Sequence, residues 1–132
     1  MQKETDILDK IFVNENEPAD KVLLVDILDG YAQIDNKGLI KYSEKYDELV
    51  GHKKVLLYLC CKKAMALRGI QGMSESASQS EVSEMAQVTL DVARNSIHKT
   101  YKKLLKKDEA GYVIPNYNLK KIKQIIRGGE NG

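Results

Sequence analysis

Hydrophobic residues recur at helical spacing through the first half of this chain of 132 residues. A first stripe predicts a short helix that ends before Pro18, and its members are Ile7, Leu8, Ile11 and Phe12. A more apolar helix is expected over residues 22–31. The sequence DNKG at 35–38 then predicts a turn, because Asp, Asn and Gly favour the backbone conformations that turns require.

A third helix is expected between the predicted turn and Gly51, which would end it. The residues with helical spacing are Leu39, Tyr42, Tyr46 and Leu49. The neighbours Leu39 and Ile40 could instead begin an extended segment, since both are apolar and follow the turn directly.

Residues 53–70 predict a central helix that is largely buried, because apolar side chains surround most of it. The narrower polar strip consists of Lys54, Lys62 and Arg68. Lys63 lies outside this strip, so it either snorkels or marks where the helix emerges. The segment GIQGMSESASQ at 69–79 is rich in small and polar residues and predicts a mobile loop.

Two short helices joined by a tight turn are predicted within SQSEVSEMAQVTLDVARNSIHKTYKKLLKK, residues 78–107. Ser78 and Glu81 have the spacing of a capping box, which marks the start of the first helix. The turn at 87–89 is too short to let the helices separate. The second helix, near 91–107, has a buried stripe of Ala93, Ile97, Tyr101, Leu104 and Leu105.

The opposite side of this second helix is basic, which makes it the candidate binding face. With Ile97 at the centre of the buried side, the residues opposite are Asn95, Lys99, Lys102 and Lys106, flanked by His98 and Lys103. Arg94 falls nearer the buried edge and ranks second among the candidates. His98 could donate to a base or phosphate, or hydrogen-bond a neighbouring carbonyl.

At these residues the chain resembles the winged helix-turn-helix superfamily over roughly 53–126. The matching features are the spacing of Val82, Met85 and Ala86, the stripe of Ile97, Tyr101 and Leu104, and the segment AGYVIPNYNL, in which Tyr112, Val113 and Ile114 resemble a wing strand. The turn lacks a glycine, and Lys106, Lys107, Asp108 and Glu109 replace an apolar first wing strand. The resemblance implies a mainly α fold, with a short β wing and an additional N-terminal helical region.

A last helix is expected to begin at Asn118, a plausible N-cap, and to end at Gly128. Its apolar stripe contains Leu119, Ile122, Ile125 and Ile126, and its other face carries Lys120, Lys121 and Lys123. Such a helix could pack on its own core or pair with a second copy, and a homodimer is the preferred interpretation. Residues 128–132 are expected to form a flexible tail.

Charge divides the chain between His52 and Lys53. Residues 1–52 contain 6 Lys plus Arg and 12 Asp plus Glu, a balance of −6, whereas residues 53–132 contain 15 and 7, a balance of +8. We therefore divide the chain into an acidic helical N-terminal region (1–52) that packs on the core, a winged helix-turn-helix domain (53–127) and the tail. A nucleic-acid partner favours the basic part.

Other classes of function find little support in the sequence. Cys60 and Cys61 are adjacent within an apolar run, which is typical of buried thiols, and no recognised Cys and His spacing predicts a metal site. No nucleophile with a base and no phosphate-binding loop is apparent, so we expect neither catalysis nor a cofactor. No apolar run is long enough for a membrane span or a signal sequence, so a cytoplasmic protein is expected.

The sequence therefore predicts a small transcriptional regulator that binds double-stranded DNA through the helix near 91–107. Asn95 and Lys99 are expected at base edges, since Asn suits adenine and Lys suits guanine. Phosphate contacts are expected from Lys102, Lys103, Lys106 and Lys107. The alternative is a winged-helix module for protein assembly that does not bind DNA, and the acidic N-terminal half is a candidate surface for a protein partner.

Overall fold

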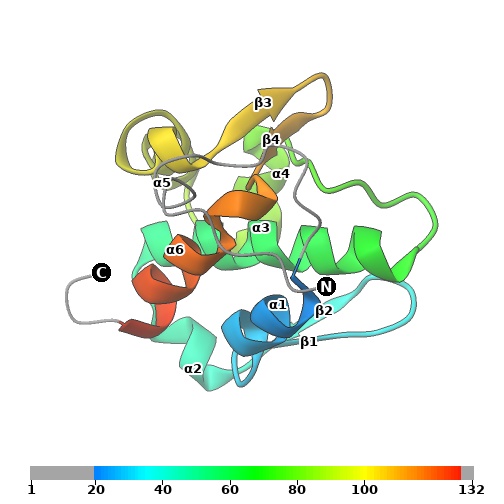
Figure 1. Cartoon of the computed structure of the whole chain (residues 1–132). Helices are drawn as coiled ribbons and strands as arrows, with labels where there is room; N and C mark the ends of the chain where they lie inside the picture. Colours follow the sequence, from blue (N-terminus) through cyan, green and yellow to red (C-terminus); the bar gives the residue numbers. More distant parts are fainter. Residues whose placement is uncertain (1–19, 129–132) are drawn as a thin grey trace, which may run out of the picture.

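The computed structural model describes residues 20–128 of a mainly helical chain with two small antiparallel sheets (Figure 1). The α-helices of this part are α1 (Lys21–Leu28), α2 (Glu44–Asp47), α3 (Gly51–Arg68), α4 (Gln79–Ala86), α5 (Leu90–Asn95) and α6 (Leu119–Lys123). Two-stranded sheets are formed by β1 (Ala32–Ile34) with β2 (Ile40–Tyr42), and by β3 (Lys106–Asp108) with β4 (Gly111–Val113). The predicted helix at residues 7–12 and most of the predicted tail lie outside the described residues.

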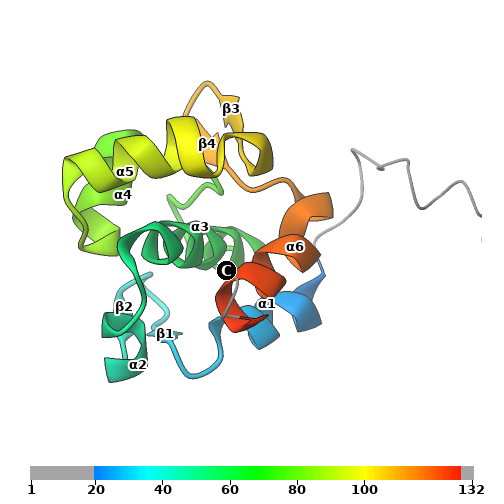
Figure 2. The same cartoon turned by 90° about the vertical axis from the view of Figure 1, so that its left-hand side faces the viewer.

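Helix α3 is the central element, as its all-round hydrophobicity predicted. Every residue from Val55 to Lys63 is buried. Figures 1 and 2 show α4, α5 and the β3–β4 hairpin on one side of α3, with α1 and α6 on another. The helix ends at Gly69, whose N–H donates to the carbonyls of Met65 and Ala66.

The prediction for Lys63 was wrong, because this lysine neither snorkels nor marks an emerging helix end. Its side chain is only 1% exposed, and its ammonium group lies 2.8 Å from a carboxylate oxygen of Glu75. The neighbouring Lys62, assigned to the polar strip, is also buried and lies 2.9 Å from Glu81. A buried ammonium group requires an ionic or hydrogen-bonding partner, and the 69–79 loop and α4 provide these carboxylates.

The third helix predicted before Gly51 was also wrong, whereas the extended alternative for Ile40 is confirmed. The Asp35 carboxylate accepts hydrogen bonds from the backbone N–H groups of Lys37 and Leu39 at 2.8 and 3.0 Å. This turn directs the chain into β2, and only the four residues of α2 are helical. Gly51 begins α3 instead of ending a helix.

Two tyrosines join this N-terminal region to the end of α4. The hydroxyl of Tyr42 donates to the carbonyl of Met85 at 2.9 Å, and that of Tyr46 donates to the carbonyl of Ala86 at 2.5 Å. The rings stack with their centroids 3.7 Å apart. Carbonyls in the last turn of a helix lack partners within the helix, so the tyrosines satisfy groups that α4 leaves open.

The last helix packs on its own chain. Leu119, Ile122 and Ile126 are buried in the common core, and the following π-helical turn, Gln124–Gly128, completes the element. The Asn118 side chain does not cap α6 as predicted, because its amide donates to the carbonyl of Leu104 at 3.0 Å. A homodimer would therefore need a surface other than this apolar stripe.

The last described residues also pack against α1. The guanidinium of Arg127 donates to the carbonyls of Asp26 and Asp29 and lies over the ring of Tyr31, 4.8 Å from its centroid. Lys123 lies 3.4 Å from the Asp26 carboxylate. These contacts place the N-terminal region and the basic part of the chain in one packed unit.

Candidate nucleic-acid interface

Helices α4 and α5 pack together across a turn of three residues. Ser78 caps α4 by accepting from the N–H of Glu81, and Thr89 caps α5 by accepting from the N–H of Val92, both at 3.1 Å. Gln87 adopts a left-handed conformation with φ of 64°, which lets a turn without glycine reverse the chain. The capping-box residues were therefore correctly predicted as the start of the first helix.

The buried side of α5 rests on the beginning of α3. Ser96 is fully buried, and its hydroxyl donates to the carbonyl of Val92 at 2.7 Å and lies 2.6 Å from His52 Nδ1. A hydroxyl has a single proton, so when both bonds form it is His52 Nδ1 that donates. A Cβ on Gly51 would lie 2.9 Å from a methyl group of Val92, so glycine permits this close approach of α3 to α5.

The helix predicted near 91–107 ends earlier in the structure. It widens into a π-helical turn, Ser96–Thr100, in which the N–H of Tyr101 donates to the carbonyl of Ser96 at 2.8 Å. The 3₁₀ turn Lys102–Leu104 follows, and Lys106 and Lys107 then belong to β3. A π-helical turn rotates less per residue than an α-helix. A helical wheel drawn with 3.6 residues per turn therefore misplaces side chains on the two sides of this turn.

The exposed side of this helix differs from the prediction at two residues. Arg94 is exposed, with 52% of its side chain accessible, and pairs with Asp91 one turn earlier. Asn95, expected to point directly outward, is half-buried. The other predicted site residues are exposed, namely His98, Lys99, Lys102, Lys103, Lys106 and Lys107.

The β3–β4 hairpin is held beside the helices by a third backbone segment. Ala77, just before α4, exchanges two hydrogen bonds with Tyr112 of β4, at 2.8 and 3.0 Å. Gly111 makes this contact possible, because its φ is +144° and a Cβ there would lie 2.3 Å from the carbonyl oxygen of Ala77. The charged residues that stand in place of an apolar first wing strand do form a strand, β3, and all three of its residues are exposed.

Asp108 fixes the turn between these strands. Its carboxylate accepts from the N–H groups of Ala110 and Gly111 at 2.8 and 3.0 Å, and from the hydroxyl of Ser76. The hydrogen bond from Ser76 is the main reason that the pKa of Asp108 lies below its usual value. The acidic residue nearest to the strand lysines in sequence is thus engaged by the hairpin itself.

Aromatic rings lie beneath several of the basic groups. The ammonium of Lys106 lies 5.6 Å from the ring centroid of Tyr117, and that of Lys107 lies 5.9 Å from that of Tyr112. The ring of His98 meets the edge of Tyr112 at 5.5 Å, and its Nε2 lies 3.1 Å from Gln79 Oε1. His98 thus meets a carbonyl oxygen, that of the Gln79 side-chain amide, which agrees with the second of the two expectations for it.

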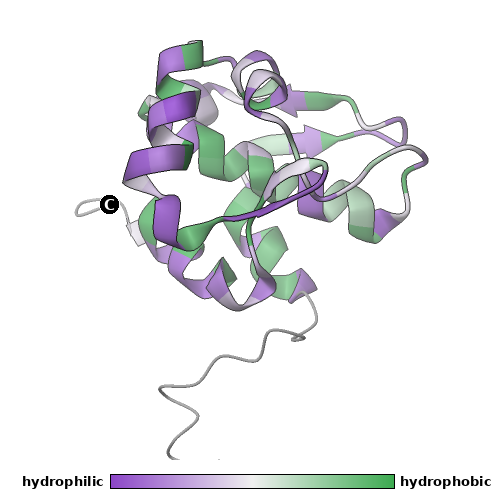
Figure 3. Ribbon diagram, turned by 90° about the horizontal axis from the view of Figure 1, so that it is seen from above, coloured by the Kyte–Doolittle hydropathy of each residue, from purple (hydrophilic) through white to green (hydrophobic). Residues whose placement is uncertain are grey.

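The resulting surface, which we call the basic face, runs from the exposed side of α5 to β3. Its members are Arg94, His98, Lys99, Lys102, Lys103, Lys106 and Lys107. Figure 3 looks down on α5 and the hairpin, and hydrophilic residues recur along these elements. Leu90 is an apolar residue at the first position of α5 and is 49% exposed.

Cys60 and Cys61 are buried thiols, and burial raises the pKa of Cys60 to about 12. Within residues 20–128, no three His, Cys, Asp or Glu side chains gather as a potential metal site. In this same part of the chain, no helix is long and apolar enough to cross a membrane.

Comparison of the chain with protein-family models, with curated proteins and with solved structures found no match.

Proposed function

We propose that this chain is a winged helix-turn-helix protein that binds double-stranded DNA, with α5 in the major groove and the β3–β4 hairpin as a short wing. The order of elements supports the proposal, since α3, an isolated β-bridge residue at Ala77, α4, α5 and the two hairpin strands follow one another. Such a helix pair presents the second helix to the groove. A role in transcription regulation follows as part of the same proposal.

The observation that carries the proposal is the position of the lysines between residues 99 and 107. Five of these nine residues are lysines, and all five are exposed. Exposed lysine on a helix often only solubilises a protein. Here, however, the lysines continue from the helix onto the adjacent strand, which gives an extended positive surface of the kind that attracts phosphates.

We assign base contacts and phosphate contacts to different residues. Arg94 takes the place that the sequence gave to Asn95, because its guanidinium is exposed and can donate two hydrogen bonds to guanine. Lys99 remains a base-contacting candidate, and the exposed side chain of Leu90 suits a thymine methyl group. Phosphate contacts come from Lys102, Lys103, Lys106 and Lys107.

Fluorescence anisotropy with duplex DNA across a range of salt concentrations tests the proposal. Removing two phosphate contacts with Lys102→Ala/Lys106→Ala should reduce the slope of log K against log salt by about 1.8, since each contact contributes about 0.9. The matched control is Lys37→Ala/Lys41→Ala, which removes the same charge from the exposed β1–β2 hairpin. Its slope should stay close to that of the unmodified protein.

A second variant separates specificity from affinity. Arg94→Ala should lessen the preference for one sequence, at a cost of about 1–3 kcal/mol on the preferred site, and leave the salt slope nearly unchanged. If the unmodified protein binds no duplex at low salt, the DNA proposal fails and the protein-assembly alternative is favoured. If both double lysine variants reduce the salt slope equally, the binding is not localised to the basic face.

A further inference from the structure

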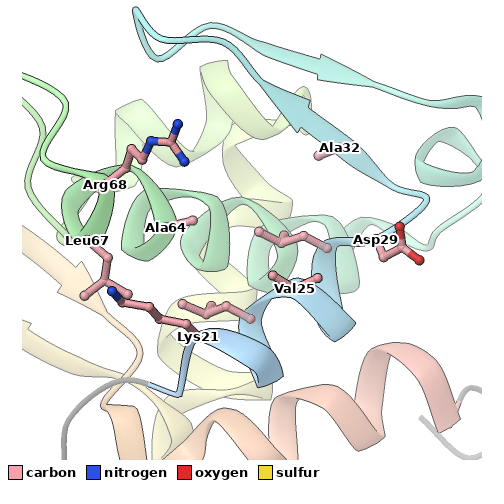
Figure 4. A pocket seen from close by; sticks show the side chains of 9 residues that line it. Lys21, Val25, Asp29, Ala32, Ala64, Leu67 and Arg68 are labelled. Carbon is pink, nitrogen blue, oxygen red and sulfur yellow. The ribbon is translucent and has the colours of Figure 1, made fainter.

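An apolar groove lies between α1 and α3, away from the basic face. Figure 4 shows it bordered by Val25 on α1 and by Ala64 and Leu67 on α3, with Lys21 and Arg68 toward one end. Its volume is about 440 Å³, which is within the usual range for ligand sites of about 300–1,000 Å³. The small side chain of Ala64 leaves room where the two helices would otherwise close the gap.

The outer face of α1 has apolar residues that nothing in the described part of the chain covers. Val25 is 64% exposed beside the groove, and Leu67 across from it is 37% exposed. Val22 is 71% exposed but does not line the groove. An exposed apolar groove of this kind is typical of a docking site for an amphipathic helix.

We propose that this groove binds the N-terminal segment of the same chain, residues 7–12. That segment ends a few residues before Lys21, which itself lines the groove. Its apolar residues, Ile7, Leu8, Ile11 and Phe12, recur at spacings that suit a helix lying in a groove.

Length and charge both favour this occupant. The eight residues 13–20 span up to about 28 Å when extended, whereas the eight residues of α1 rise only about 12 Å. The linker can therefore place the segment anywhere along the groove. Residues 1–19 contain two basic and five acidic residues. The groove lining contains two basic residues, Lys21 and Arg68, and one acidic residue, Asp29, which lies toward the other end in Figure 4, so the basic end suits an acidic segment.

Docking of this segment in its own chain makes the groove an internal interface of the folded protein. It also holds the acidic N-terminus on α1 and α3, away from the basic face.

The chain contains no tryptophan, so Phe12→Trp in the full-length protein gives a single tryptophan as a fluorescent reporter. Its emission should be blue-shifted and protected from acrylamide quenching. Adding Val25→Asp should return the emission to that of exposed tryptophan. The matched control, Val22→Asp, changes a valine of similar exposure outside the groove and should leave the emission shifted.

Circular dichroism melting of each variant checks that the fold is kept. The proposal is overturned if the reporter tryptophan emits as an exposed one when Phe12→Trp is the only substitution, or if both aspartate substitutions have the same effect. A blue shift that disappears on dilution would assign the groove to a second copy of the chain and also overturn docking within one chain. None of these outcomes depends on DNA binding.

Discussion

The hydrogen bond from Tyr46 to the end of α4 allows a quantitative test of how the N-terminal region supports the helix pair. Tyr46 is fully buried, and its hydroxyl donates to the carbonyl of Ala86 at 2.5 Å. The substitution Tyr46→Phe keeps the ring and its stacking on Tyr42 but removes the donor. The Ala86 carbonyl then remains buried without this partner.

The expected loss in the free energy of unfolding is about 1–3 kcal/mol, the usual cost of leaving a buried acceptor without its hydrogen bond. For a domain of this size, a loss of about 2 kcal/mol lowers Tm by roughly 6–10 °C. Tyr42→Phe is the matched control, because it removes the same atom from a bond to the neighbouring carbonyl of Met85. Tyr42 is only half-buried and Met85 is 38% exposed, so water can reach this carbonyl and replace the hydroxyl. We therefore expect a loss of only about 0.5–1 kcal/mol.

Urea denaturation followed by far-UV circular dichroism measures both variants. If the slope of the free energy of unfolding against urea concentration is unchanged, the substitution has altered stability and not the surface area that unfolding exposes. Equal losses for the two variants, or a loss below about 0.5 kcal/mol for Tyr46→Phe, would refute the argument from burial. Two separate transitions would show that the N-terminal region and the helix pair unfold independently, contrary to what their packing in one unit leads us to expect.

Two further predictions concern the hairpin and the response to alkaline pH. Gly111→Ala should lower the free energy of unfolding by more than about 2 kcal/mol in urea denaturation, because the positive φ is unfavourable for alanine and the added Cβ would clash with Ala77. The control Gly72→Ala also has a positive φ, but its Cβ would enter open space, so it should lose only about 1 kcal/mol. Equal losses for the two variants would contradict the clash. Burial raises the pKa values of six groups among the described residues, which are Tyr42, Tyr46, Tyr58, Tyr101, Cys60 and Cys61. Each raised pKa means that the unfolded state loses its proton first, so stability is retained below about pH 8.5 and falls above it. Above about pH 8.5, the two thiols together lower the free energy of unfolding by up to about 2.7 kcal/mol per pH unit, and the tyrosines add to this decrease above about pH 10. Urea unfolding measurements that show constant stability from about pH 8 to pH 10.5 would contradict this.

The exposure of the candidate site residues was predicted correctly where charge alone decides. Lysines at positions 99 to 107 are exposed in the structure, as expected of charged residues that lie away from an apolar stripe. The relative exposure of Arg94 and Asn95 was predicted in the wrong order, because the widened turn at Ser96 is not apparent from spacing. The same lack of a local signal placed Lys106 and Lys107 in a helix when they belong to a strand.

The sequence by itself determined the elements whose signals are local. The hydrophobicity of α3, the Ser78 cap of α4 and the segregation of charge all depend on residues a few positions apart, so short-range rules are sufficient. Tertiary structure decided the remainder. Ile40 enters a strand, Lys63 is buried against Glu75, and β4 pairs with Ala77, because each depends on partners distant in the sequence. Hydrophobic spacing is compatible with more than one local structure, and such long-range hydrogen bonds and ion pairs select among them.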